Sequence, residues 1–204
     1  MPGALWTRGI IEAARAQAAP SLTRVVVAID PAATSNAHAD ETGIIVAGGD
    51  GQGQGWVLAD VSGRYQPTEW AKTAIAAYRA HHADRIVAEV NHGGEMIEAT
   101  LRVIDPNVPF AAVRASRGKI ARAEPAAALY EQGRVRHVGT FPQLEDQMFS
   151  FVPAGHGDAD LRPAGHSPDR VDALVWALTD LLIEPMPDQG IFEVYRKLAQ
   201  QARS

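Results

Sequence analysis

Cysteine is absent from the chain, and this absence excludes several kinds of chemistry at once. Without a thiol the protein has no disulfide, no thiolate zinc site and no cysteine nucleophile. No apolar run approaches the roughly 18 residues that would span a bilayer. The N-terminal sequence MPGALWTRGIIEAARAQ also lacks the apolar stretch and cleavage site of a secretory signal. These absences predict a protein of the cytoplasm with no membrane partner.

An excess of basic residues is also lacking, because 19 lysines and arginines face 24 acids, for a net charge of −5. Taken alone, this balance argues against a nucleic-acid partner. The average conceals a basic segment from Arg114 to Arg136, in which basic residues outnumber acids. Its basic residues are Arg114, Arg117, Lys119, Arg122, Arg134 and Arg136, against Glu124 and Glu131. Acids are therefore over-represented elsewhere, either in a metal site or on ordinary solvated surface.

Three runs of apolar and β-branched residues open the chain and predict successive strands at 24–30, 43–48 and 55–61. The glycine-rich spacer between the second and third runs is a turn former, so these two strands should form an antiparallel hairpin. Only the loop 31–42 separates the first strand from the second. We therefore expect the first three strands to form a meander.

Helices and strands are expected to alternate after the meander. Expected helices cover 67–82, 93–104, 120–132, 142–151, 168–182 and 191–202, with a lead-in helix over 6–18, and strands cover 85–90, 109–114 and 134–138. No glycine fingerprint of a dinucleotide-binding fold follows the first strand. The order predicts an α/β fold with a ribonuclease H-like mixed sheet, three antiparallel strands and then parallel ones, flanked by helices.

Three acids stand out because their surroundings are apolar. Asp30 ends the first strand, Glu89 lies within the run IVAEV, and Asp172 lies in the most apolar helix of the chain. A carboxylate in such a place needs a cation, a donor or a proton. Each has a structural alternative, such as the common turn start Asp-Pro at Asp30. Together they indicate a shared cation.

The expected topology brings these acids together, because the first strand should lie beside the strand at 85–90 and the last apolar helix should cross the sheet. Hard cations such as Mg²⁺ or Mn²⁺ prefer oxygen ligands, and two of them can stabilise both oxygens of a phosphodiester displacement. Asp169 lies three residues before Asp172 and on the same helical face, so it could reach the same metal pair. It could equally be a helix-start acid that favours the helix dipole.

Basic residues that follow the strand at 109–114 are candidates for holding DNA. Arg117, Lys119 and Arg122 are close together, and contacts to phosphates need charge rather than base recognition. An exposed basic helix start explains them about equally well. Asp40 and Glu41, before the second strand, are more simply interpreted as surface acids of a loop than as acids behind a metal site.

Several stretches in this order resemble the nuclease domain of viral or prophage DNA-packaging terminase large subunits. They are VAIDPA (27–32), ADETGIIV (39–46), VAEVNHGG (87–94), GKIARAEP (118–125) and SPDRVDAL (167–174). The resemblance implies a two-metal nuclease that cuts concatemeric double-stranded DNA. By matching position, Asp30, Glu89 and Asp172 would be the catalytic, metal-binding acids, with Asp169 a fourth.

The resemblance also implies partners and a domain organisation. Complete large subunits carry a packaging ATPase, but this chain has no G-x-x-x-x-G-K-S/T loop. We therefore expect residues 1–22 to be a lead-in segment from an absent ATPase domain, 23–184 the nuclease domain and 185–204 a C-terminal helix or tail. Expected partners are the ATPase domain, the small terminase subunit and the portal protein, in the bacterial cytoplasm and transiently at the procapsid portal.

Two alternatives remain open at the level of sequence. A Holliday-junction resolvase-like nuclease shares the closing pair of helix acids and would prefer branched DNA. A non-catalytic module would dock on DNA or on the portal, and its acids would be residual. Metal-dependent cleavage separates the enzymes from the module, and substrate preference separates the two enzymes.

Overall fold

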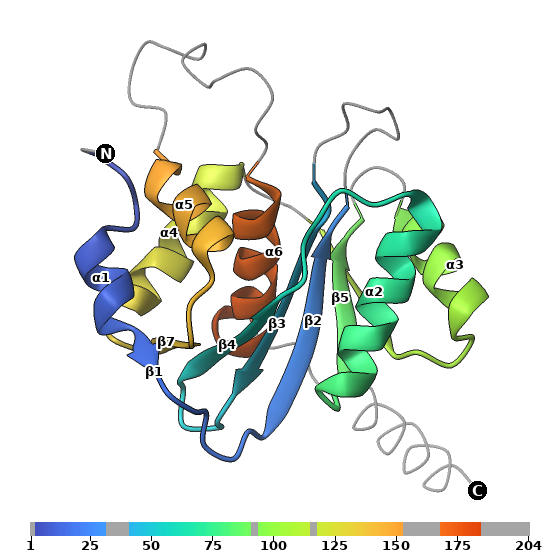
Figure 1. Cartoon of the computed structure of the whole chain (residues 1–204), viewed down its shortest axis with the longest axis horizontal. Coiled ribbons are helices and arrows are strands. Elements are labelled where there is room, and N and C mark those ends of the chain that lie inside the picture. Colours follow the sequence, from blue (N-terminus) through green and yellow to red (C-terminus); the bar gives the residue numbers. More distant parts are fainter. Residues whose placement is uncertain (1–2, 32–40, 91–93, 115–117, 153–167, 185–204) are drawn as a thin grey trace, which may run out of the picture.

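The computed structural model describes residues 3–31, 41–90, 94–114, 118–152 and 168–184. These residues form one mixed seven-stranded sheet with helices on both faces (Figure 1). The strands are β1 (Arg15–Ala16), β2 (Arg24–Asp30), β3 (Gly43–Gly49), β4 (Gly55–Asp60), β5 (Arg85–Glu89), β6 (Phe110–Val113) and β7 (Val135–Val138). The helices are α1 (Arg8–Ala13), α2 (Pro67–Ala80), α3 (Gly94–Ile104), α4 (Lys119–Glu131), α5 (Pro142–Ser150) and α6 (Asp169–Leu178), which the π-helix η1 (Thr179–Ile183) continues.

The order of strands in the sheet is β1-β7-β4-β3-β2-β5-β6. β2, β3 and β4 pair antiparallel in sequence, whereas β5 pairs parallel with β2 and β6 parallel with β5. The meander, the hairpin and the mixed ribonuclease H-like sheet predicted from the sequence are therefore confirmed. The parallel pairing of β2 with β5 brings together the ends of the strands that carry Asp30 and Glu89.

The sheet separates two apolar layers. On one face α2 and α3 cover alternate residues of the central strands, among them Val27 and Ile29 of β2. On the other face α6 packs across β2 and β3, where Val26 and Ala28 contact Trp176 and its neighbours, and α1, α4 and α5 extend this layer. Central strands covered on both faces are expected to be apolar throughout, as β3 is.

The N-terminal segment differs from the sequence prediction. The expected helix over 6–18 ends at Ala13, and Arg15–Ala16 instead form β1, which pairs parallel with β7 at the edge of the sheet. Trp6 and Ile11 are buried in the layer of α4 and α5. Two residues are too few to show the alternation that marks a strand in the sequence. The partner β7 also lies far along the chain. The domain boundary at residue 23 stays a prediction.

The boundaries of the other predicted elements lie within about two residues of the observed boundaries wherever the structure describes them. The helix expected over 168–182 corresponds to α6 together with η1. The helix expected at 191–202 lies outside the described residues. Among the described helices, none is long and apolar enough to cross a membrane.

Candidate metal centre

Asp30 reaches the site because of the alternation of side chains along β2. Val26 and Ala28 point to the face that α6 covers, and side chains two residues apart point the same way. Asp30 continues this series at the C-terminal end of the strand. The carboxylate therefore faces the beginning of α6, at the edge where the apolar layer ends.

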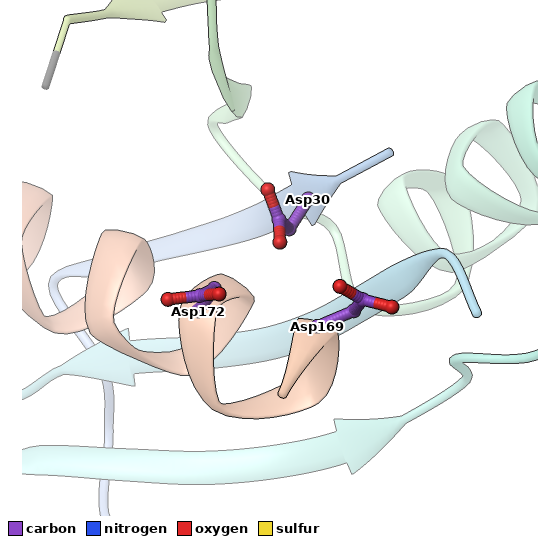
Figure 2. Close-up of side chains that lie close together, drawn as sticks. All are labelled: Asp30, Asp169 and Asp172. Atoms are coloured by element: carbon purple, nitrogen blue, oxygen red, sulfur yellow. The ribbon is translucent and has the colours of Figure 1, made fainter. Parts of the chain in front are cut away.

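Asp169 and Asp172 come from the first turn of α6 and are both buried. Residues three apart share one face of a helix, so the two carboxylates project toward β2 together. An acid in the first turn also interacts favourably with the positive end of the helix dipole. One carboxylate oxygen from each of Asp30, Asp169 and Asp172 lies within 4.8 Å of the others (Figure 2).

Glu89 borders this cluster without belonging to the group of three. It is the last residue of β5, and the residue before it, Ala88, is paired with Ile29 of β2. Its Oε2 atom accepts a hydrogen bond of 2.9 Å from Nη1 of Arg122. Glu89 therefore lies at the same edge of the sheet, where its charge acts on Asp30.

The electrostatics of the cluster favour a cation. Burial raises the pKa of Asp30 well above its ordinary value, and the charges of Asp172, Asp169 and Glu89 raise it further, against the opposing charge of Lys119. Like charges held this close in a poorly solvated place repel one another. Several carboxylate oxygens converging on one point are the ligands that hard divalent cations prefer. The residues present therefore fit Mg²⁺ or Mn²⁺.

Two cations from α4 partly neutralise the acids in the structure. The Nζ atom of Lys119 donates a hydrogen bond to Asp172, and Arg122 lies between Glu89 and the ring of Trp176, 4.5 Å from the ring centroid. Burial would lower the pKa of Lys119, but the charges of Asp172, Asp30 and Asp169 outweigh it and raise this pKa. Both basic side chains therefore lie directly against the acids.

Comparison with known proteins decides the family. Residues 27–181 match the family model described as terminase RNase H-like domain, which is more than half of the chain. The chain belongs to this family. None of the curated protein sequences compared with it matches.

Solved terminase structures share the fold of the terminase domain at low identity. The nuclease of the large terminase from thermophilic phage G20c is 14% identical with a TM-score of 0.56, over 78% of this chain and 82% of that one. A variant nuclease domain of the large terminase subunit of bacterial virus Sf6, with manganese, is 14% identical with a TM-score of 0.62, over 86% and 98%. The HK97 bacteriophage large terminase is 13% identical with a TM-score of 0.62, over 86% and 43%. The domain thus spans less than half of that last chain.

The structure places most, but not all, of the predicted site residues of the terminase domain. Asp30, Asp169 and Asp172 come together, and Glu89 lies beside them. Arg117 lies outside the described residues. The side chain of Arg122 is only 12% exposed, which the interpretation as an exposed helix start did not anticipate. The role of these basic residues in holding DNA stays a prediction.

One residue that the sequence interpretation passed over is Arg170, between the two acids of α6. Its side chain is 3% exposed and its guanidinium contacts the acids Glu41 and Asp60. The interpretation of Glu41 as a plain surface acid missed this ion pair. The available signal was an arginine inside an apolar helix, since a buried cation requires a partner.

Proposed function

We propose that this terminase domain is a metal-dependent endonuclease that cuts double-stranded, concatemeric DNA during viral genome packaging. The observation that carries the proposal is the convergence of Asp30, Asp169 and Asp172 within 4.8 Å. Membership of the terminase RNase H-like family supports it. So does a structurally similar terminase nuclease domain with manganese.

Two Mg²⁺ or Mn²⁺ ions are the proposed cofactors, held by Asp30, Asp169 and Asp172 with Glu89 at the margin. Bound as a pair, such ions supply positive charge to the attacking and leaving oxygens of phosphodiester hydrolysis. Asp30 lies where the acids of α6 meet the end of β5, so it would hold the ions together with those acids. No side-chain nucleophile is needed, which suits a chain without cysteine.

Basic residues of the segment 114–136 would hold the DNA backbone beside these acids. Lys119 and Arg122 bond to Asp172 and Glu89 in the structure. Metal binding at the acids would release both side chains for phosphate contacts, whose strength falls as salt concentration rises. In the infected cell, the proposed partners are a packaging ATPase domain, the small terminase subunit and the portal protein, in the host cytoplasm and at the procapsid.

Plasmid cleavage tests the proposal. The protein is incubated with supercoiled plasmid and Mn²⁺, Mg²⁺ or EDTA, alongside Asp30→Asn and Asp172→Asn. We expect nicking and linearisation with a divalent metal only, and a loss of about 100-fold or more in both variants, because each removes a ligand charge. Asp105→Asn is the matched control, since Asp105 lies in an ion pair with the exposed Arg79 outside the cluster.

The other outcomes identify the alternatives. Folded protein that binds DNA and cuts it with neither metal would contradict the endonuclease proposal and favour the docking module. Strong preference for a four-way junction over linear duplex would favour a resolvase-like enzyme instead.

A further inference from the structure

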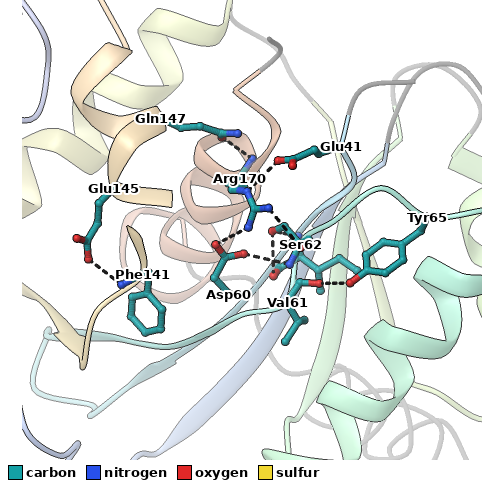
Figure 3. A network of polar contacts seen from close by, with 10 residues as sticks. Glu41, Asp60, Val61, Ser62, Tyr65, Phe141, Glu145, Gln147 and Arg170 are labelled. Atoms are coloured by element: carbon teal, nitrogen blue, oxygen red, sulfur yellow. Dashed lines mark hydrogen bonds and ion pairs between the residues drawn. The ribbon is translucent and has the colours of Figure 1, made fainter. Parts of the chain in front are cut away.

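Arg170 is embedded in a set of acceptors at the beginning of α6 (Figure 3). Its Nε atom donates to Glu41 at 2.9 Å, Nη1 to Asp60 at 2.7 Å and Nη2 to the carbonyl oxygen of Ser62 at 3.4 Å. Glu41 precedes β3, whereas Asp60 is the last residue of β4 and Ser62 follows it. One side chain therefore ties the first turn of α6 to both strands of the hairpin.

The acceptors are themselves fixed in place. The second carboxylate oxygen of Asp60 accepts from the backbone N–H of Ser62 at 3.0 Å, and the backbone N–H of Arg170 donates to Gln147 of α5 at 3.0 Å. The planar guanidinium presents its donors in a rigid fork, which lysine does not reproduce. The position of the helix start is thus constrained by geometry as well as by charge.

Gly43 gives a second, independent constraint at the same turn. It begins β3 and is the antiparallel partner of Asp30. A Cβ atom at residue 43 would clash with the carbonyl oxygen of Asp169 and lie 2.5 Å from its carbonyl carbon. A backbone carbonyl cannot rotate away as the end of a side chain can. Only glycine therefore lets the helix start lie this close to β3.

Helix geometry connects these contacts to the acids. Residues advance by about 100° around an α-helix, so Arg170 points to a different side from Asp169 and Asp172. Its contacts with the β3–β4 hairpin therefore leave the two acids directed at Asp30. We infer that Arg170 and Gly43 are positioning residues that set the spacing of the metal-binding carboxylates. The inference rests on the proposed function.

Manganese affinity tests the inference apart from catalysis. Free Mn²⁺ is measured by electron paramagnetic resonance during titration of the wild type, Arg170→Gln, Arg170→Lys and Gly43→Ala. Changes behind the ligands of a metal site typically weaken metal binding by about 10- to 100-fold. We expect losses of that size for Arg170→Gln and Gly43→Ala, and a smaller loss for Arg170→Lys, which keeps the charge without the fork.

Two control variants separate positioning from general stability. Arg85→Gln breaks a buried ion pair with Asp180 in η1, the π-helix that continues α6. Gly49→Ala adds a methyl group at the other end of β3, where the nearest side-chain atom, on Leu181, is an ordinary 3.7 Å away. Both should leave the Mn²⁺ affinity unchanged, even if Arg85→Gln lowers the melting temperature as much as Arg170→Gln does.

The outcomes distinguish this inference from the proposed function. Wild-type affinity for Mn²⁺ in Arg170→Gln and Gly43→Ala would overturn the inference and leave the endonuclease proposal standing. Equal losses in the variants and their controls would overturn it too, because stability alone would then explain them. Absence of Mn²⁺ binding in the wild type would overturn both. If Arg170→Gln does not fold, Gly43→Ala and its control decide the result.

Discussion

At the scale of single residues, the acids of the candidate centre oppose the stability of the metal-free fold. Asp169 and Asp172 are each 4% exposed, and both raise the pKa of the neighbouring Asp30 through repulsion. Lys119 offsets only part of this charge. Such a cost is typical of sites that bind or react, where function opposes stability.

The variant Asp30→Asn tests this repulsion. Removing this charge relieves the repulsion, so the metal-free variant should be more stable by about 1 kcal/mol, or about 2–4 °C in melting temperature. Addition of Mn²⁺ should raise the melting temperature of the wild type much more than that of the variant, because a ligand stabilises the state that binds it. Thermal unfolding followed by circular dichroism, with EDTA or Mn²⁺, measures both effects.

A lower melting temperature of Asp30→Asn in EDTA would contradict the repulsion argument. Asp105→Asn serves as the control again, and its response to Mn²⁺ should equal that of the wild type.

At the scale of elements, the N-terminal segment is part of the apolar layer. Trp6 is 1% exposed and makes edge-to-face contacts with Tyr130 of α4 and Phe151, at centroid distances of 6.2 and 5.7 Å. β1 extends the sheet by pairing with β7. The segment thus contributes core contacts and a strand to the domain.

We predict that Trp6→Ala lowers the free energy of unfolding by about 3–5 kcal/mol, because it leaves a large cavity in a packed layer. Unfolding in urea measures this as a lower midpoint with an unchanged slope. Arg8→Ala is the control in the same segment, since Arg8 is exposed and its guanidinium stacks on the ring of Phe149. Equally small effects of both variants would show that the segment unfolds separately from the domain.

At the scale of the whole molecule, a chain of polar groups joins the N-terminal strand to the helices. The Tyr130 hydroxyl lies 2.8 Å from Nε2 of His137, whose Nδ1 lies 3.2 Å from Glu145. Glu145 also pairs with both terminal nitrogens of Arg15 and accepts from the backbone N–H of Phe141 at 3.0 Å. Burial opposes the charge of Glu145, but the bonds from Arg15, His137 and Phe141 outweigh it and lower its pKa.

The pH dependence of stability follows from this lowered pKa. An acid whose pKa is lower in the folded state stabilises the fold at pH values above its pKa in the unfolded state, which is near 4.5. This contribution is lost as the pH falls from 4.5 toward the lower pKa of the folded state. We predict that Glu145→Gln lowers the free energy of unfolding by about 2–3 kcal/mol at pH 7. It removes the charged acceptor of both Arg15 nitrogens, and Arg15 keeps its longer ion pair with Glu12 at 3.5 Å. The difference between wild type and variant should shrink below pH 4.5.

Urea unfolding of both proteins at several pH values between 3 and 7 gives this difference. Glu131→Gln, at an exposed acid near the end of α4, should stay close to the wild type throughout. A difference for Glu145→Gln that stays constant across this range would contradict the assigned pKa direction.

Much of the site could be predicted from the sequence, because its acids stand out locally. Asp30 and Glu89 end buried strands, and Asp172 interrupts an apolar helix. A charge in an apolar run is costly wherever the chain folds, so the pattern alone marks these residues. The position of Asp169 was equally visible, but only the structure shows that it reaches the same point as Asp30 and Asp172.

The sequence by itself determined the order of the strands and helices, the mixed sheet and the acids at its edge, because periodicity and turn residues act over short distances. Only the tertiary structure decided the pairing of β1 with β7, the contacts of Arg170 with Glu41 and Asp60, and the bond from Lys119 to Asp172. The physical reason is separation along the chain: Arg170 and Glu41 are 129 residues apart. Such partners come into contact only when the whole sheet and its helices pack, and no local sequence pattern predicts the contact.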